Sequence, residues 1–166
     1  ALNEKPAKTN QPDLMTPGVA LEKILQQTAS LYDLPVKIVG EAIVTMDKDQ
    51  VLTIVDNLLG NYSTQVRKKD KALLELDIAI DVQGDKVVTS IEDIHGVPFP
   101  WPERLFEPFW SEHGSGRGIG LYQARQQANA AGGDLSAIAS PDKPLRFILT
   151  LPASLEKKPT YCGYFQ

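Results

Sequence analysis

The order of hydrophobic and polar residues divides this chain into stretches with two different periods. In three stretches apolar residues recur every three or four positions, which predicts helices with one buried face. We expect the first helix to begin at Thr16 and Pro17, an N-cap followed by a first-turn proline, and to end near Tyr32 and Asp33. The apolar faces of the three helices consist of Val19, Leu21, Ile24, Leu25, Thr28 and Leu31 in the first, Val51, Leu52, Val55, Leu58 and Leu59 in the second, and Leu121, Ala124, Ala128 and Ala131 in the third.

Local signals mark the ends of the second and third helices. Asp47, followed three residues later by Gln50, resembles a capping box and predicts the start of the second helix. Residues 66–71 are mostly charged, so we expect a connector after that helix. Gly132 and Gly133 predict the end of the third helix, because glycine adopts the left-handed conformation of a C-cap.

Elsewhere apolar and polar residues alternate, which predicts strands with one buried face. The clearest example consists of Leu74, Leu76, Ile78, Ile80 and Val82. The expected strands lie within residues 35–39, 42–46, 74–82, 87–93, 135–139 and 145–151, with turns at 84–85 and 141–142. The prolines of residues 98–102 predict neither a helix nor a central strand there.

The order of these elements predicts the fold class. Because most strands arrive as hairpins, we expect an α/β (α+β) fold, a two-layer sandwich whose mixed, mostly antiparallel sheet is covered by helices on one face. The 166 residues are enough for one domain with its own core. We expect that domain at residues 15–153, between a linker or disordered tail at 1–14 and a C-terminal tail at 154–166.

Composition argues against several classes of function. The formal net charge is −4, and the short basic cluster Arg67-Lys68-Lys69 is interrupted by Asp70, so nucleic acid is not the expected partner. The single Cys162 cannot form an intrachain disulfide, and two histidines with one cysteine do not supply a usual structural zinc site. No apolar run predicts a membrane span and no signal peptide is evident. We expect no membrane contact by this chain.

Two groups of residues suggest chemistry. Four glycines alternate through residues 114–120 just before the third helix, so bare backbone N–H groups and a helix N-terminus could bind a polyphosphate. The alternative is a flexible linker. Asn57 and Asn61 lie one turn apart on the second helix and could reach a polar cleft, with one amide oxygen on Mg²⁺. The alternative is two exposed amides near a fraying helix end.

These motifs together resemble the ATP-binding catalytic domain of sensor histidine kinases, which has the Bergerat fold shared with gyrase, heat-shock chaperone and mismatch-repair ATPases. Residues 57–61 (Asn-Leu-Leu-Gly-Asn) are similar to the N box of that family. Residues 106–110 (Phe-Glu-Pro-Phe-Trp) are similar to the F box, and residues 116–121 (Gly-Arg-Gly-Ile-Gly-Leu) to the G2 box. Gly132-Gly133 matches the glycine pair that follows the G2 helix. The resemblance covers about residues 16–152.

The resemblance implies roles for particular residues. Asn61 would hold Mg²⁺, and Asn57 would orient phosphate or the incoming nucleophile. Phe106 and Phe109 would anchor the lid. Gly96 belongs to the adenine loop, and the nucleotide-binding residues of the G2 box would be Gly116, Arg117, Gly118, Ile119, Gly120 and Leu121.

Two motifs depart from the family pattern. Counting back from Gly96 places Glu92 at the acid that binds adenine, whereas strand alternation with Val87, Thr89 and Ile91 favours Asp93. In the register that places Glu92 at the acid, Ile94 stands at the first glycine of the motif, and in either register one glycine is lost. His113 stands where the family has the lysine that reaches the terminal phosphate. A mostly neutral histidine weakens charge stabilisation there, for which Arg117 could compensate.

The resemblance predicts a two-component histidine kinase domain that uses ATP and Mg²⁺ and donates the γ-phosphate to a histidine on a separate dimerisation domain. Its expected partners are that domain, a response regulator and a second copy of the full-length protein. The expected location is the cytoplasm, with any inner-membrane anchor outside this chain. The altered motifs favour an alternative, a pseudokinase-like interaction module. An ATPase domain of a chaperone or topoisomerase relative is disfavoured, because a catalytic Glu is replaced by Asn57 or Asp56.

Overall fold

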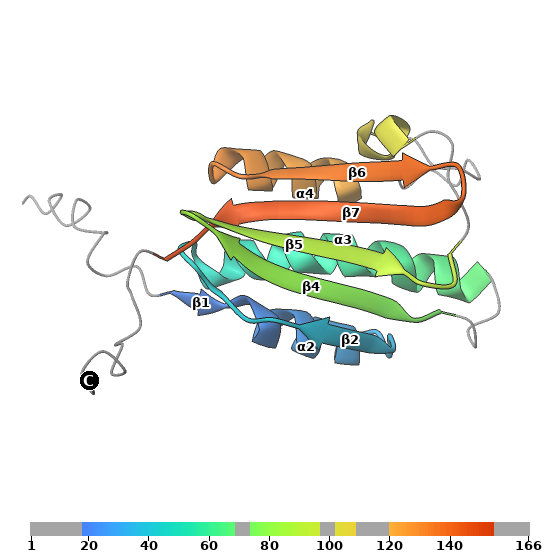
Figure 1. The fold of residues 1–166 in the computed structure, drawn as a ribbon, viewed down its shortest axis with the longest axis horizontal. Coiled ribbons are helices and arrows are strands. Elements are labelled where there is room, and N and C mark those ends of the chain that lie inside the picture. Colours follow the sequence, from blue (N-terminus) through green and yellow to red (C-terminus); the bar gives the residue numbers. More distant parts are fainter. Residues whose placement is uncertain (1–17, 69–73, 97–101, 109–119, 155–166) are drawn as a thin grey trace, which may run out of the picture.

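The computed structural model describes residues 18–68, 74–96, 102–108 and 120–154. Within this part of the chain, five strands form the main sheet in the order β2-β4-β5-β7-β6. β2 pairs with β4 in parallel, and the other neighbouring strands are antiparallel. The helices lie together on one face of this sheet (Figure 1), so the predicted two-layer fold is confirmed. The elements are α2 (Leu21–Leu31), β2 (Val36–Val39), α3 (Lys48–Lys68), β4 (Leu76–Gln83), β5 (Lys86–Asp93), α4 (Gly120–Ala130), β6 (Asp134–Ser140) and β7 (Lys143–Pro152).

Strand alternation produces one buried and one open face of the sheet. In β4 the side chains of Leu76, Ile78 and Ile80 are buried, while the alternate Asp77 and Ala79 are exposed. Successive residues of a strand point to opposite faces, so the apolar set packs under the helices. The polar set remains on the open face.

The described part of the chain begins and ends at a second, smaller sheet. β1 (Val19–Ala20) pairs antiparallel with β3 (Ile43–Val44). On the other side of β3, Ala153 forms a bridge with Val44. The N–H of Ser154 donates to a carbonyl of β3 at 2.9 Å. The first described strand, β1, and the last described residues, 153–154, therefore both pair with β3.

The predicted start of the first helix at Thr16 and Pro17 is wrong. α2 begins at Leu21, because the two preceding residues pair with β3 and their backbone groups are committed to that ladder. Leu31, expected on the buried face, is 82% exposed as the last residue of the helix.

The predicted connector at residues 66–71 is partly wrong, since α3 continues through Lys68. Arginine and lysine are good helix formers, so charge alone did not mark a break. Val82, expected on the buried face of β4, is 51% exposed. Pro102 is helical after all: it begins the 3-10 helix η3 (Pro102–Phe106), where its fixed φ suits the first position. The rest of the proline segment lies outside the described residues.

The predicted caps of α3 and α4 are confirmed. The Asp47 carboxylate accepts the N–H of Asp49 at 3.1 Å, which satisfies a free donor in the first turn of α3. At the end of α4, Gly132 has φ +89°, and the N–H of Gly133 donates to the carbonyl of Ala128 at 2.8 Å. The glycine pair therefore forms a C-cap.

Candidate functional site

The middle of α3 meets the N-terminus of α4. A Cβ built on Gly120 would lie 3.6 Å from Oδ1 of Asn57 and 3.7 Å from its backbone oxygen. The Asn57 side chain thus stands beside the first residue of α4, where backbone N–H groups lack helical partners. The structure brings these two predicted site residues together.

The Asn57 amide has an unused hydrogen-bond donor. Its Nδ2 is buried and has no hydrogen-bond partner within the described part of the chain. A buried polar atom without a partner costs about 1–3 kcal/mol, so such atoms usually have a reason to be retained. A phosphate oxygen or another acceptor at the start of α4 would satisfy it, and the residues present fit an anionic ligand.

Other members of the predicted site differ in burial, and several lie outside the described part of the chain. Asn61 is partly buried one turn further along α3, on the side of Asn57. Leu121 is 6% exposed and contributes to the hydrophobic core of the domain. The remaining predicted residues lie outside the described part of the chain, namely Phe109, His113, Gly114, Gly116, Arg117, Gly118 and Ile119.

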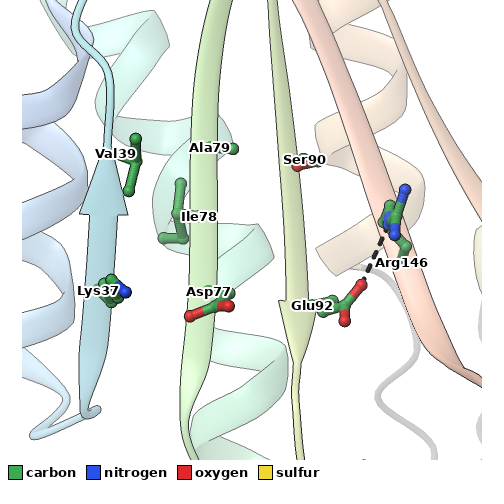
Figure 2. Close-up of a pocket in the computed structure, with 8 residues that line it drawn as sticks. All are labelled: Lys37, Val39, Asp77, Ile78, Ala79, Ser90, Glu92 and Arg146. Atoms are coloured by element: carbon green, nitrogen blue, oxygen red, sulfur yellow. Dashed lines mark hydrogen bonds and ion pairs between the residues drawn. The ribbon is translucent and has the colours of Figure 1, made fainter.

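The two candidate acids for adenine lie on opposite faces of the sheet. The Asp93 side chain shares the helix-covered face with the buried Ile91, whereas the Glu92 side chain points to the open face. Figure 2 shows the Glu92 carboxylate directed towards Arg146, whose Nε lies 3.1 Å from Glu92 Oε1. Glu92 is therefore separated by the sheet from Asn57.

Glu92 belongs to a row of charges across the open face. Lys37 lies opposite Asp77, Asp77 opposite Glu92, and Glu92 opposite Arg146 in the strand registers. These side chains border a hollow of about 300 Å³ whose floor includes Ala79 (Figure 2). The ion pair of Glu92 and Arg146 offsets the repulsion between the two adjacent acids.

Asp93 is held by the backbone around it. Its Oδ1 accepts the N–H groups of Glu75 and His95, each at 3.1 Å. Its carbonyl accepts the N–H of Gly96 at 2.9 Å, which closes the turn after β5. His95 Nε2 in turn lies 3.2 Å from a carboxylate oxygen of Glu75. The Asp93 carboxylate is thus fixed in orientation through one oxygen.

Tyr62, the residue after Asn61 on α3, is buried against Phe147 and lies close enough to Asp93 and Glu92 to feel their charge. Its ring packs edge to face with Phe147 at 6.1 Å. Burial raises the pKa of Tyr62 well above its ordinary value, and the negative charges of Asp93 and Glu92 raise it further. The phenol therefore stays protonated beside Asp93 at any physiological pH. Its position next to Asn61 was the available signal.

Phe106 forms the described part of the predicted aromatic anchor. It is 7% exposed and packs edge to face with Phe147 at 6.4 Å between ring centroids. The guanidinium of Arg125 on α4 lies 4.4 Å from the centre of the Phe106 ring, within the range of a cation–π contact. Sequence reasoning missed Arg125, whose signal was a long cationic side chain one turn after the buried Leu121.

Comparisons with known proteins place the chain among sensor kinases and related ATPases in sequence. Residues 46–155 match the model of the histidine kinase-, DNA gyrase B- and HSP90-like ATPases. The chain is 30% identical over 110 residues to the alginate biosynthesis sensor protein KinB of Pseudomonas aeruginosa, covering 64% of this chain and 18% of KinB. It is 35% identical over 91 residues to the sensor protein kinase PilS of the same species, covering 52% of this chain and 17% of PilS.

The fold also matches a solved structure. The mycobacterial sensor histidine kinase MprB superposes with a TM-score of 0.67 at 17% identity, over 84% of this chain and 98% of the MprB chain. No helix in the described ranges is long and apolar enough to cross a membrane. The chain spans less than a fifth of the length of KinB or PilS. Because the family model matches most of its residues, the chain belongs to the histidine kinase-, DNA gyrase B- and HSP90-like ATPase family.

Proposed function

We propose that this chain is the ATP-binding catalytic domain of a two-component sensor histidine kinase, which donates the γ-phosphate of ATP to a histidine on a separate dimerisation domain. The observation that carries the proposal is the Asn57 side chain, which lies beside Gly120 at the start of α4 and whose buried Nδ2 has no hydrogen-bond partner among the described residues. An amide donor and a helix N-terminus together suit a phosphate group. The names of the sensor kinases that the chain resembles support the same function.

Each site residue has a proposed role. Asn57 donates to phosphate, and Asn61 supplies an amide oxygen to Mg²⁺, which would neutralise phosphate charge when bound. The described residues contain no cluster of three acid, His or Cys side chains for a metal ion, so this site depends on amide, phosphate and water oxygens. The glycines of residues 114–120 cradle the phosphates.

We assign the adenine amino group to Asp93 rather than to Glu92. Asp93 lies on the helix-covered face, and its Oδ1 is committed to two backbone donors, which leaves Oδ2 for a ligand. Glu92 faces away and is engaged by Arg146. Positioning of adenine at one end and of phosphate at the other is the main contribution that such a domain makes to phosphoryl transfer.

The assembly around the domain is also proposed. Its partners are the dimerisation domain of the same protein and a response regulator, and the full-length protein is a homodimer. We place the domain in the cytoplasm, with any anchor in the inner membrane elsewhere in the protein. Neither nucleic acid nor membrane contact is assigned to this chain.

A second function, a pseudokinase-like interaction module, is favoured by Ile94. Counted back from Gly96, this residue stands at the first glycine of the adenine loop, and in either register it follows closely on the acid; its N–H donates to the carbonyl of Glu75 at 2.9 Å. Its side chain is 39% exposed at the turn beside Asp93. A branched side chain there would reduce the space for adenine.

Nucleotide titration distinguishes the two functions. A fluorescent ATP analogue should bind with micromolar affinity only when Mg²⁺ is present. Asp93→Asn keeps an oxygen for the backbone donors but replaces the other oxygen with an NH₂ group that cannot accept from adenine, so affinity should fall about tenfold. Glu92→Gln, the matched control on the opposite face, should bind as the parent does. Asn61→Ala should abolish binding even with Mg²⁺ present, because it removes the proposed protein ligand of the ion. No binding at millimolar ATP would leave the interaction module.

A further inference from the structure

Within the described part of the chain, three aromatic rings pack together between the helices and the sheet. Phe147 of β7 is at the centre. Tyr62 of α3 packs edge to face on it at 6.1 Å between ring centroids, and Phe106 does so at 6.4 Å. Aromatic pairs with this geometry are favourable beyond the area that they bury. The Tyr62 ring is therefore held in the core of the domain.

The register of the sheet locates the Tyr62 ring relative to Asp93. Phe147, on which the ring packs, lies opposite Ile91 in the pair of β5 and β7. Asp93 points to the same helix-covered face as Ile91, two residues or about 7 Å further along β5. α3 and β5 end towards the same side of the domain (Figure 1). Burial and then the charge of Asp93 raise the pKa of Tyr62, so the ring lies near that carboxylate.

The other sides of Asp93 are also occupied. Its neighbour in the sheet is Leu76 of β4, which is fully buried. At the turn after β5, a Cβ built on Gly96 would lie 3.5 Å from Cβ of Asp93 and 3.5 Å from Cβ of Pro144. The strand and the turn are fixed by backbone hydrogen bonds. Tyr62 contributes only a side chain here, so it is the neighbour that can leave by rotation about χ1.

The burial of Tyr62 distinguishes a residue that lines a pocket from one that fills it. An aromatic residue that lines an open pocket keeps one face of its ring exposed, so that a base can stack on it. Tyr62 is only 5% exposed, so protein atoms already cover nearly all of its ring. A base has no ring face to stack on while Tyr62 keeps this position.

We propose that the Tyr62 ring closes the adenine end of the site, and that the base reaches Asp93 only after this ring has rotated away. The proposal rests on the proposed function, because it concerns the same site. Rotation removes the ring from its contact with Phe147 and exposes apolar surface to water, which lowers the affinity for the base. The phosphate end, at Asn57 and the start of α4, does not depend on this rotation. Tyr62 is thus a specificity residue for the base.

The test compares a nucleotide with a phosphate chain that carries no base. Tyr62→Ala removes the ring, so a fluorescent ATP analogue with Mg²⁺ should bind about tenfold more tightly than to the parent. Tyr62→Leu keeps part of the core contact and should shift affinity in the same direction, which covers the case of an unfolded alanine variant. Tyr62→Phe keeps the ring and should show no gain. Inorganic triphosphate should bind the parent and the folded variants with equal affinity.

Leu151→Ala is the matched control. Leu151 is fully buried on the same face of β7 as Phe147, but it lies opposite Val87 at the other end of β5. It should leave the affinity for the analogue unchanged, and far-UV circular dichroism should show that each variant is folded. An equal gain in affinity for this control would indicate a general loosening of the core and would overturn the proposal.

The remaining outcomes separate this proposal from the proposed function. If the parent binds the analogue and the Tyr62 variants bind it equally or more weakly, the role of Tyr62 is overturned and the proposed function stands. If Tyr62→Ala or Tyr62→Leu binds the analogue and the parent does not, the role of Tyr62 is supported and the parent is the interaction module. If neither the parent nor any variant binds the analogue, both proposals are overturned.

Discussion

Replacement of Gly133 by alanine would measure how closely the end of α4 packs against β7. A Cβ on Gly133 would lie 1.9 Å from the carbonyl oxygen of Thr150 and 2.9 Å from its carbonyl carbon. The neighbouring Gly132 is the matched control, because a Cβ there would meet no described atom within 4 Å. The clashing atoms at Gly133 belong to backbone in the middle of a strand, so they cannot rotate away.

The losses of stability caused by Gly132→Ala and Gly133→Ala should therefore differ in size and in physical cause. Gly132 has φ +89°, so alanine there costs about 1–2 kcal/mol of conformational strain without a clash. At Gly133 the clash must be relieved by separating β6 from β7, an overpacking cost of about 1–3 kcal/mol. The hydrogen bond from the Gly133 N–H to Ala128 would lengthen, adding about 1 kcal/mol. We expect a total loss of roughly 3 kcal/mol for Gly133→Ala.

Urea unfolding of the parent and both variants, followed by far-UV circular dichroism, would give the free energies of unfolding. The slopes should be equal, so that differences in midpoint report stability rather than a changed denatured state. If Gly133→Ala were no more destabilising than Gly132→Ala, the close approach of α4 to β7 would not exist in solution. The reasoning from the Cβ distance would then be refuted.

Three further outcomes are expected. Asn57→Leu should raise the free energy of unfolding by about 1 kcal/mol, because it removes a buried donor that has no partner among the described residues, and should abolish ATP-analogue binding. A loss of stability would show that Nδ2 has a partner. Arg125→Gln should cost about 0.5–1 kcal/mol in urea unfolding through the lost contact with the Phe106 ring, and Arg125→Lys less. Because the pKa of Tyr62 is raised on folding, the unfolded chain loses this proton first as pH rises above about 10, so stability should fall there. Tyr62→Phe should reduce that fall in alkaline urea titrations.

Local patterns in the sequence were sufficient to predict most of the fold. Alternation predicted β4 and β5, and the glycine pair predicted the end of α4, because these features depend on neighbouring residues. The start of α2 was mispredicted for a different reason. Thr16 and Pro17 carry a valid local start signal, but β1 pairs with β3, some 24 residues away, and this pairing outweighs the signal. Local sequence does not report such long-range pairing.

Only part of the candidate site could be predicted, again because local sequence does not report contacts between distant residues. The spacing of Asn57 and Asn61 on one helix follows from the sequence, but the contact between Asn57 and Gly120 joins residues 63 positions apart. The motif order suggested that contact through family resemblance, and α3 packing on α4 provides it. Tyr62 and Arg125 were not assigned to the site, because neither belongs to a motif and each acquires its position through packing on Phe147 or Phe106.

The two acids at the end of β5, Glu92 and Asp93, show how strand geometry distinguishes two candidates that the motif alone does not. Counting from Gly96 pointed to Glu92, whereas strand alternation favoured Asp93, because adjacent residues of a strand face opposite sides. Glu92 completes a charge row on the open face through Arg146, which accounts for an acid there without any ligand. Asp93 has no such partner on its face among the described side chains, and it is oriented by two backbone donors instead. An acid held in this way beside the buried Tyr62 is positioned to accept from a ligand, and this difference makes the exchange of Asp93 against Glu92 the informative comparison.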